Sequence, residues 1–255
     1  MMKKLLRLLY RLVKPVIDPR KVALILKYRK FISDYYNYRR LGGKLSSINI
    51  YPCLGDDTNS TGFDAQYLYQ SIWAFKQIVK HSPESHHDIG SDIRFAGPLS
   101  TLIKVEFVDI RPAKLNIEGF TSKKGSVVDL PYPDSSINSL SCLHVIEHIG
   151  LGRYGDPLDP MGSDKAFLEL SRVLANKGLC LLSVPIGTPK VEFNAHRVFS
   201  VDEVNNLTKE LVIVSMAAVD ENGRYIEDIE IDRLKELESN CSSSFLGLFA
   251  FTKEA

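Results

Sequence analysis

The sequence predicts an α/β protein with a doubly wound, mostly parallel sheet. Three observations predict this class. From residue 85 onward, short apolar runs rich in β-branched residues alternate with amphipathic segments, the pattern of right-handed βαβ units. The first apolar run leads into a turn at Gly90, and the next two end on Asp109 and Asp129. A long connection joins the last two runs, which favours an antiparallel last strand.

Seven strands are expected, preceded by a helix over residues 64–80. The apolar residues Tyr67, Ile72, Phe75 and Val79 line much of one face of that helix, which is the face expected to be buried. The strands are expected at residues 85–90, 104–110, 126–130, 139–143, 179–184, 211–219 and 244–252.

Three further helices are expected between these strands. The first is a short helix over residues 93–101, and the second is an amphipathic helix over residues 164–174 that closes at Lys177-Gly178. The third covers residues 201–210, where Ser200 is an N-cap candidate with Glu203 three residues later.

Residues 1–44 are predicted to form a basic helical extension ahead of a domain over residues 45–255. They contain 13 Lys and Arg and two Asp, so their net charge is +11; because the chain carries +1, the other 211 residues carry −10. Leucines on one helical face and basic residues on the other are typical of a helix lying in a membrane surface. We therefore expect residues 1–30 to contact an anionic membrane peripherally. The alternative is a helix packed on the domain or on a second subunit.

Composition excludes several classes. The chain of 255 residues is 44% hydrophobic and 25% charged, which is ordinary for a globular protein with a sizeable core. The four cysteines lie far apart without a CxxC pair, which argues against a disulfide framework and fits the reducing cytoplasm. No recognition motif accompanies the basic arm, and the remaining body is acidic, so a nucleic-acid partner is not expected.

The turn after the first strand and the carboxylates after the next two predict a nucleotide-type ligand. A glycine such as Gly90 lets the backbone approach a ligand closely. Asp109 follows Asp88 by 21 residues, a distance at which a carboxylate can accept hydrogen bonds from ribose hydroxyls. Asp129, or the amide beside it, could contact an adenine amino group. The combination is more specific than either signal alone.

Residues 85–185 resemble the core of the class I, Rossmann-like methyltransferases that use S-adenosylmethionine. The resemblance rests on Asp-Ile-Gly-Ser at 88–91, Asp-Leu-Pro-Tyr-Pro-Asp at 129–134 and His-Val-Ile-Glu-His at 144–148. Residues 64–200 also resemble a narrower group of uncharacterised bacterial methyltransferase-like proteins, through Phe-Asp-Ala-Gln-Tyr at 63–67, residues 105–112, residues 144–157 and Asn-Ala-His-Arg-Val-Phe-Ser at 194–200.

The resemblance implies S-adenosylmethionine as cofactor. The residues expected to bind it are Asp88, Gly90, Ser91, Asp109, Ile110, Asp129, Leu130 and Leu143. One departure concerns the first motif. The family pattern is Asp/Glu-x-Gly-x-Gly-x-Gly, whereas this chain has Gly90-Ser91-Asp92-Ile93-Arg94. Asp92 would therefore lie near the cofactor, where it would attract the sulfonium and amino group or weaken binding.

The expected reaction is methyl transfer to oxygen of a small or glycan-type acceptor, with a histidine as general base. The candidate bases are His144 and His196, with His148 behind them, and Glu147 either orients a histidine or stabilises a helix N-terminus. The Gly- and Pro-rich loop 150–162 is expected to wall the substrate pocket. The expected substrate contacts are Arg153, Tyr154, Asp156, Asn194 and Arg197.

Two other interpretations stay open at this point. His144-x-x-Glu147-His148 matches the HxxEH pattern of zinc hydrolases, although Gly150 and Gly152 would break the helix that such a site needs. A metal held by His144, His148 and Asp156 without peptidase chemistry is a related option. The altered glycine motif and the basic arm instead suit a catalytically degenerate protein that keeps the fold for binding.

Overall fold

The computed structural model describes residue 10 and residues 27–43, 51–57 and 59–254. The chain divides into two units, residues 1–62 and residues 63–255. The boundary predicted after residue 44 falls inside the first unit and stays a prediction. The described part of the first unit contains helix α3 (Tyr28–Arg40), which buries no residue. The leucine-rich segment expected to meet a membrane lies almost wholly outside the described residues. Within the described residues, no helix is long and apolar enough to cross a bilayer.

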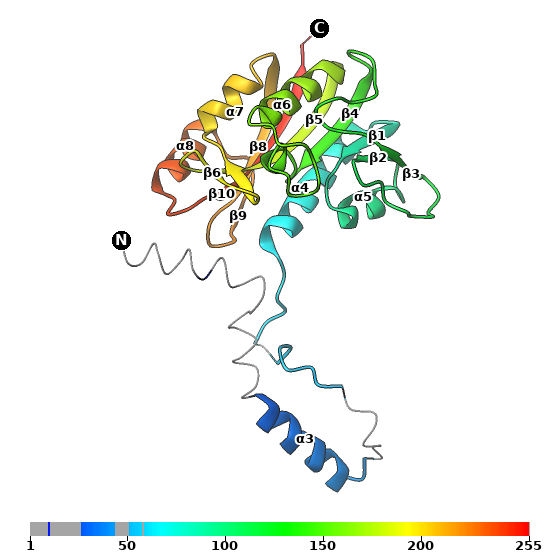
Figure 1. Ribbon diagram of the computed structural model, residues 1–255, viewed down its shortest axis with the longest axis vertical. Helices are drawn as coiled ribbons and strands as arrows, with labels where there is room; N and C mark the ends of the chain where they lie inside the picture. Colours follow the sequence, from blue (N-terminus) through cyan, green and yellow to red (C-terminus); the bar gives the residue numbers. More distant parts are fainter. Residues whose placement is uncertain (1–9, 11–26, 44–50, 58, 255) are drawn as a thin grey trace. The chain divides into compact units, whose positions relative to one another are not determined.

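The second unit is built on a sheet of eight strands (Figure 1). The strand order is β3-β2-β1-β4-β5-β10-β8-β9. The strands are β1 (Ser85–Ile89), β2 (Lys104–Asp109), β3 (Phe120–Lys124), β4 (Ile137–Leu143), β5 (Leu174–Ile186), β8 (Leu211–Val219), β9 (Tyr225–Ile226) and β10 (Phe245–Lys253). The pairs among β1 to β5 are parallel, whereas β10 is antiparallel to both β5 and β8, as the long final connection predicts. The chain order reverses between β1 and β4, which is where ligands bind in open α/β sheets.

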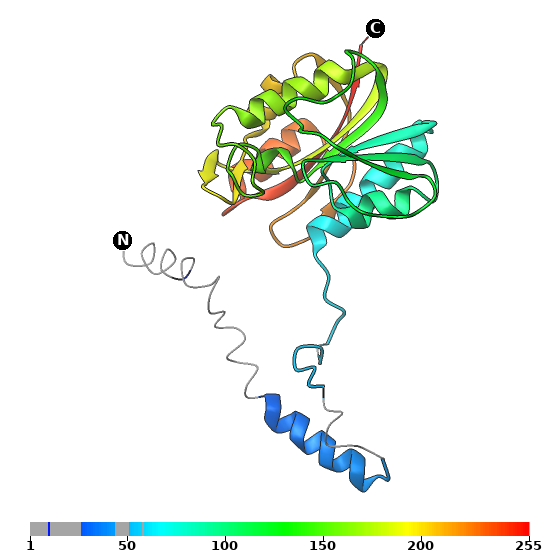
Figure 2. The same ribbon diagram turned by 45° about the vertical axis from the view of Figure 1, so that its right-hand side comes forward.

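Helices cover both faces of this sheet, so the strands are buried on both sides (Figure 2). Helices α4 (Ala65–His81) and α5 (Ile93–Leu99) pack on one face, around the buried Trp73 and Phe95. Helices α6 (Gly162–Val173), α7 (Val201–Leu207) and α8 (Ile231–Asn240) contribute to the core on the other face. The Ser200–Glu203 capping box predicted for α7 is present.

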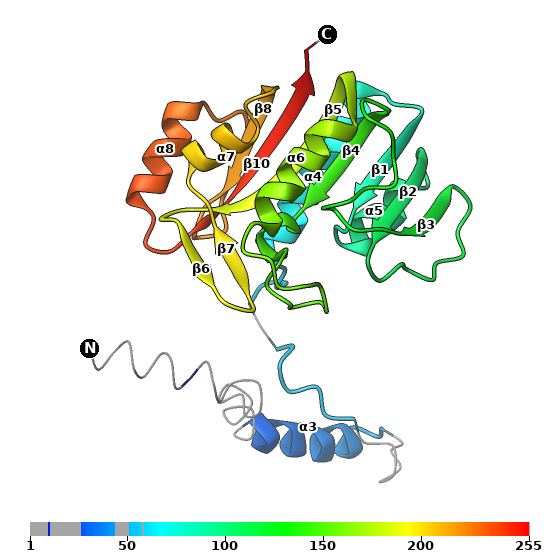
Figure 3. The ribbon, with the colours of Figure 1, turned by 45° about the horizontal axis from the view of Figure 1, so that its top comes forward.

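A short hairpin lies outside the main sheet (Figure 3). It consists of β6 (Lys190–Glu192) and β7 (His196–Val198), and it follows β5 directly. The 3-10 turn η2 (Ile146–His148) follows β4 and contacts β7. These two segments flank the carboxyl ends of β4 and β5, where the candidate site lies.

The predicted third strand is wrong. Residues 126–130 form a turn in which the Asp129 amide donates to the Ser126 carbonyl at 3.0 Å, and the strand that pairs with β2 is residues 120–124. The apolar pair Val127-Val128 suggested a strand; in the structure both residues line a cavity and also pack into the core that includes α6. The expected seven strands become eight in the main sheet, through the two-residue strand β9, and the hairpin β6–β7 brings the described strands to ten.

Two helix predictions also need correction. In α4 the buried residues are Gln70, Trp73, Ala74 and Ile78, whereas Val79 is 62% exposed. Apolar residues surround this helix, so periodicity alone does not choose the buried face. Helix α6 runs directly into β5, and the predicted closing pair Lys177-Gly178 lies where the β4–β5 register shifts.

Candidate functional site

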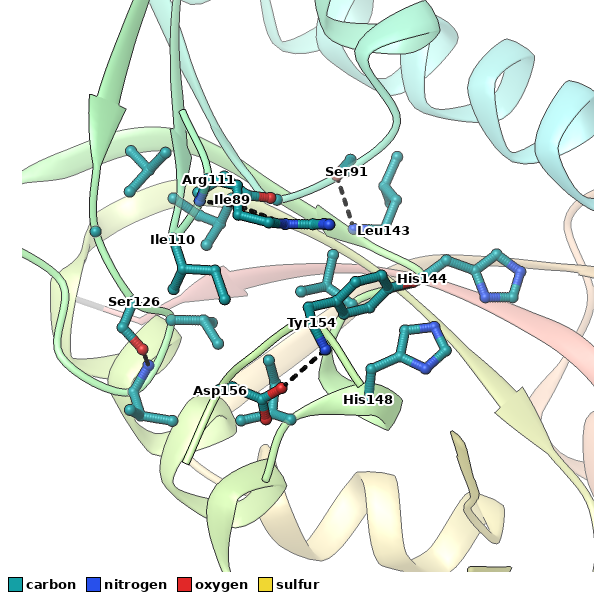
Figure 4. A pocket seen from close by; sticks show the side chains of 18 of the residues that line it. Ile89, Ser91, Ile110, Arg111, Ser126, Leu143, His144, His148, Tyr154 and Asp156 are labelled. Carbon is teal, nitrogen blue, oxygen red and sulfur yellow. Dashed lines mark hydrogen bonds and ion pairs between the residues drawn. The ribbon is translucent and has the colours of Figure 1, made fainter. Parts of the chain in front are cut away.

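A cavity of about 500 Å³ opens at the carboxyl ends of β1, β2 and β4. Its size is that of a small-molecule or cofactor pocket. Most of the wall is apolar, with Ile89, Phe107, Ile110, Val127 and Leu143 among the lining residues, and Figure 4 shows several of these side chains around it. The polar groups enter from the strand ends and from the loop after η2.

Gly90 and Asp109 lie side by side in this cavity. Gly90 has φ +71°, a left-handed conformation that glycine adopts without strain. A Cβ atom built there would lie 3.3 Å from Val145 Cγ1 and 3.6 Å from Asp109 Oδ2. The Asp109 Oδ1 atom accepts from the Arg111 amide at 2.6 Å. The turn therefore leaves an open cradle between β1 and β2, next to the second oxygen of a carboxylate.

Asp88 does not line the cavity, contrary to the expected cofactor contact. Its side chain is fully buried beneath the turn, where Oδ1 accepts from the Ser91 amide at 3.0 Å and Oδ2 accepts from the Ser141 hydroxyl at 2.5 Å. Ser91 does line the cavity, and its hydroxyl accepts from the Leu143 amide at 3.0 Å. Burial raises the pKa of Asp88 to about 6, against the opposing effect of these hydrogen bonds. Asp88 therefore stabilises the turn through its hydrogen bond with the Ser91 amide instead of contacting a ligand.

Asp129 and Leu130 are likewise not among the lining residues. Asp129 is exposed, and Leu130 is buried with its amide donating to Glu169 Oε1 at 2.6 Å. The wall at this position comes instead from residues 125–128. Because residues 126–130 turn rather than extend, the carboxylate points away from the crevice in which a strand end would have placed it.

His144 and Glu147 form a hydrogen-bonded pair at the end of β4. His144 Nδ1 lies 2.6 Å from Glu147 Oε1. Glu147 is 1% exposed, and burial alone would raise its pKa, but the charge and hydrogen bond of His144 keep it below its ordinary value. An ionised Glu147 accepts from Nδ1–H and leaves His144 Nε2 with a free lone pair. Within the described chain, Nε2 is buried and has no hydrogen-bond partner.

The backbone of His144 is itself unusual, with φ +57°. Non-glycine residues in this region cost about 1–3 kcal/mol and cluster at functional sites. The strain is sustained because the His144 amide donates to Ser183, to both the carbonyl oxygen (3.1 Å) and Oγ (2.9 Å). Ser183 Oγ donates to the buried Gln70 at 2.8 Å. The Tyr67 ring stacks on the imidazole, with centroids 5.2 Å apart.

His148 and His196 lie in the opposite arrangement to the expected one, in which His196 faced the substrate and His148 lay behind. His148 lines the cavity, whereas His196, on β7, does not, and the two rings lie 6.5 Å apart. His148 Nδ1 contacts the Ala195 carbonyl at 2.5 Å, and its Nε2 lies 3.7 Å from Glu147 Oε1. Burial lowers the pKa of both histidines, so both favour the neutral form. Glu147 therefore lies between two imidazoles.

The loop after η2 forms one side of the mouth, as expected. Asp156 accepts from the Gly150 amide at 2.7 Å and from the Tyr154 amide at 3.3 Å, so its carboxylate holds the loop together. The Tyr154 ring meets Arg111 on one face at 4.4 Å and packs edge-on with His148 (Figure 4). The Arg111–Tyr154 contact links the β2 side of the cavity to the loop after β4.

Three of the expected substrate contacts are structural instead. Arg197 is 9% exposed, and its guanidinium donates to the carbonyls of Ile149, Asp159 and Pro160 and to Ser163 Oγ. Asn194 donates to the Leu151 carbonyl, and Arg153 donates to the Ala195 carbonyl. None of the three lines the cavity. Their donors bind backbone carbonyls of the loop after η2 and of the turn between β6 and β7.

The geometry does not support a metal centre. Among the described residues, no group of three or more His, Cys, Asp and Glu side chains could hold a metal ion. Asp156 is occupied by loop amides, and His144 and His148 do not share a helix, because η2 spans three residues and His144 has a left-handed backbone. Both the HxxEH zinc hydrolase and the metal site of His144, His148 and Asp156 are therefore set aside.

Several residues that line the cavity were not predicted from the sequence to bind a ligand. Tyr67, Val145 and Arg111 face the cavity, as does the Ser126–Val128 segment. Tyr67 and Arg111 both belong to the quoted motifs, so the signal was present, but nothing in the sequence places the start of α4 against the end of β4. Asp92, which was expected near the ligand, lines the cavity and is bonded to Arg94.

Comparison with known proteins supports the fold. A family model described as "Caenorhabditis protein of unknown function, DUF268" matches residues 132–238, less than half of the chain. No curated protein matches. The narrower bacterial group suggested by the motifs stays a prediction.

Solved structures with the same fold include several methyltransferases. A candidate sarcosine dimethylglycine methyltransferase from Galdieria sulphuraria aligns with a TM-score of 0.53 and 14% identity over 87% of this chain and 98% of that one. Haemonchus contortus phosphoethanolamine N-methyltransferase 2, solved with phosphomonomethylethanolamine and S-adenosylhomocysteine, aligns at 0.51 and 13% identity over 73% and 53% of the two chains. The 4+2 cyclase SpnF aligns at 0.52 and 11% identity over 73% and 81%. The fold is therefore that of class I methyltransferases, and it also carries other chemistry.

The assignment of Arg197 to loop support is testable by unfolding. Arg197→Met removes the donors to four loop acceptors and should lower the free energy of unfolding by about 3 kcal/mol, because hydrogen bonds from a buried charged group are worth about 1.5–3 kcal/mol. Urea denaturation measures the change. Arg153→Met, at an exposed position, is the control and should cost less than about 0.5 kcal/mol. Equal stability of the two variants would contradict the structural role of Arg197.

Proposed function

We propose that the protein transfers a methyl group from S-adenosylmethionine to a small acceptor. The observation that carries the proposal is the Gly90 cradle beside Asp109, at the strand-order reversal of a methyltransferase-type sheet. Fold similarity alone would not support an activity, because one fold serves many functions. The proposal therefore depends on the cavity and on the groups that line it.

The residues present suit this cofactor. Asp109 Oδ2 would accept from ribose hydroxyls, and the open side of Gly90 would let the ligand lie against the backbone. The apolar segment Val127-Val128 would flank the adenine in place of the expected Asp129. Asp92 would face the positive end of the cofactor, although its bidentate bond to Arg94 already neutralises part of its charge. The cofactor supplies an activated methyl group on a sulfonium.

Cofactor binding is tested by calorimetric titration with S-adenosylmethionine and S-adenosylhomocysteine. Asp109→Ala should weaken binding at least tenfold, because the charged Oδ2 acceptor for the ribose hydroxyls is lost. Asp129→Ala is the matched control: it removes a carboxylate that is exposed and outside the cavity, so affinity should stay within about twofold. Absence of binding by the unmodified protein would favour the catalytically degenerate alternative.

His144 is the base that we propose for an oxygen acceptor. The hydroxyl proton would pass to His144 Nε2 while the acceptor oxygen forms its bond to the methyl carbon and the sulfur–carbon bond breaks. Glu147 fixes the tautomer and stabilises the imidazolium that results, since its Oε1 accepts from Nδ1 at 2.6 Å. The products are the methyl ether, S-adenosylhomocysteine and a proton, which His144 releases to solvent. His196 is no longer proposed, because it does not line the cavity.

Access to this base involves Tyr67. Because Nε2 is shielded from solvent and Tyr67 stacks on the ring, an acceptor reaches Nε2 only after a side chain moves. Tyr67 is the side chain that we expect to move. A small or glycan-type hydroxyl acceptor suits the polar mouth formed by Tyr154, Arg111 and His148. The small phosphomonomethylethanolamine bound to the Haemonchus protein is consistent with an acceptor of this size.

The base is tested with radiolabelled S-adenosylmethionine and a panel of sugars and glycan precursors. His144→Ala should leave cofactor affinity unchanged and reduce methyl transfer by about 10²–10⁴-fold, the usual contribution of a general base. His196→Ala should retain most of the activity. If His144→Ala turns over as fast as the unmodified protein, His144 is not the base.

We also propose that residues 1–30 bring the protein to an anionic membrane surface, at the cytoplasmic face. Residues 1–30 contain ten Lys and Arg and one Asp, a net charge of +9, and each basic residue near such a surface contributes about 1 kcal/mol. Exposed aromatic residues accompany the charge: Tyr10 is 42% exposed, as is Tyr28. Tyrosine prefers the interface between lipid and water.

Liposome flotation tests this proposal. The full chain should bind vesicles containing phosphatidylserine, binding should weaken with salt, and deletion of residues 1–30 should abolish it. Vesicles of neutral phosphatidylcholine are the control. Equal binding by the truncated and full-length proteins would remove the arm from consideration.

A further inference from the structure

A chain of buried polar groups runs beneath the Gly90 turn and connects β1 to β4. His86 Nδ1 lies 2.8 Å from Ser139 Oγ, and His86 Nε2 lies 2.8 Å from Ser141 Oγ. Ser141 Oγ donates to Asp88 Oδ2 at 2.5 Å, and Asp88 Oδ1 accepts from the Ser91 amide. The exposed fraction of His86, Asp88 and Ser141 is 0%, so the network is closed off from bulk solvent. Every step of this relay is a direct contact.

The hydrogen-bonding capacities allow one proton arrangement when Asp88 is ionised. A carboxylate only accepts, so the single hydroxyl proton of Ser141 must point to Asp88. Ser141 Oγ then accepts from His86 Nε2–H, because it has no second proton to donate. A neutral imidazole carries one N–H, so His86 Nδ1 accepts from the Ser139 hydroxyl. All the contacts are satisfied with His86 as the Nε2–H tautomer.

A proton on Asp88 Oδ2 reverses the whole chain. The carboxylic acid would donate to Ser141, whose own proton would then turn to His86 Nε2. The imidazole proton would have to sit on Nδ1 and point to Ser139. The remaining carboxyl oxygen of Asp88 would be neutral, and a neutral oxygen accepts from the Ser91 amide more weakly than a carboxylate does. The protonation state of Asp88 is therefore coupled to the strength of the hydrogen bond that the Ser91 amide donates to it.

We propose that His86 is a positioning residue for the Gly90 turn: donating from Nε2 through Ser141, it keeps Asp88 in the carboxylate form that holds the Ser91 amide. Full burial supports the neutral imidazole that this requires, since it lowers the pKa of His86 to about 3. The inference rests on the proposed function only in taking this turn as the cofactor-binding one. The tautomer of His86 and the hydrogen bond from the Ser91 amide to Asp88 can be measured whether or not the protein binds this cofactor.

Other titratable groups surround the relay. His87, on the same strand, and His81, at the end of α4, both oppose a positive charge on His86. Asp109, at the end of β2, opposes the negative charge on Asp88, and the buried thiol of Cys142 on β4 also interacts electrostatically with Asp88. The donors from Ser141 and Ser91 are thus what favours the carboxylate against burial and Asp109.

The test is nuclear magnetic resonance of the full-length protein labelled with ¹⁵N, without any ligand. At pH 7 the His86 ring, assigned by loss of its signals in His86→Gln, should carry its proton on Nε2. The amide shift of Ser91 should titrate with a midpoint near pH 6, with the Asp88 carboxyl. A proton on Nδ1 at pH 7, or a Ser91 amide that does not titrate, would overturn the proposal.

Variants separate the relay from general damage to the fold. Asp88→Asn must either direct its NH₂ group to Ser141, which moves the His86 proton to Nδ1, or lose the bond to the Ser91 amide. If both the tautomer and the Ser91 shift stay as in the unmodified protein, the relay is wrong. Ser141→Ala breaks the chain between His86 and Asp88 and should raise the midpoint of the Ser91 titration. Ser139→Ala, which touches His86 from the other side, is the matched control and should leave that midpoint unchanged.

The effect on the cofactor site is measured separately. At pH 7, Ser141→Ala should bind S-adenosylhomocysteine about tenfold more weakly than the unmodified protein, the loss expected for one hydrogen bond to a charged group. Ser139→Ala should bind it within about twofold. If the unmodified protein binds no S-adenosylhomocysteine, the proposed function fails, while the tautomer and the Ser91 titration still decide the relay. Equal affinities of all three proteins would remove the link to the cofactor.

Discussion

The buried carboxylate of Asp88 is the constraint on which the site depends. It lies where the order of the parallel strands reverses, and it accepts hydrogen bonds from the Ser91 amide on the turn after β1 and from Ser141 on β4. A charge in this position is costly unless hydrogen bonds satisfy it. Its two partners therefore have to stay in place, and the turn that carries Gly90 is held at the strand ends.

The loop over residues 146–162, on one side of the cavity, is held by charged side chains that bind its backbone groups. Residues 146–162 form no long helix, so their backbone groups need partners from elsewhere. Asp156 satisfies amides from within this segment, and Arg197 reaches across from β7 to satisfy its carbonyls. Arg197 does not line the cavity, and the Asp156 carboxylate, which does, is already hydrogen-bonded to loop amides. A substrate would therefore meet the aromatic and imidazole groups of Tyr154, Tyr67 and His148.

The difference between side chains that support the loop and side chains that line the cavity bears on which function the site suits. Asp156 and Arg197, which looked like metal or substrate ligands in the sequence, are hydrogen-bonded to the loop. The unpartnered Nε2 of His144, by contrast, is a buried basic atom with no structural use in the described chain. A buried polar atom without a partner calls for an explanation, and the proposed role as base supplies one for this atom. The degenerate interpretation has to account for a strained backbone at this residue.

The sequence by itself determined the fold class, the positions of β1, β2 and β8, the antiparallel last strand and the glycine–carboxylate pair of the turn. It could do so because alternating strands and helices leave a local periodic signal, and because Asp109 lies directly at the end of its strand. The tertiary structure decided the buried face of α4, the edge strand β3 and the turn that directs Asp129 outward. It also decided which of the clustered histidines lines the cavity. Those outcomes depend on contacts between segments far apart in the chain, such as Tyr67 with His144 and Arg197 with Ile149, which no local pattern encodes.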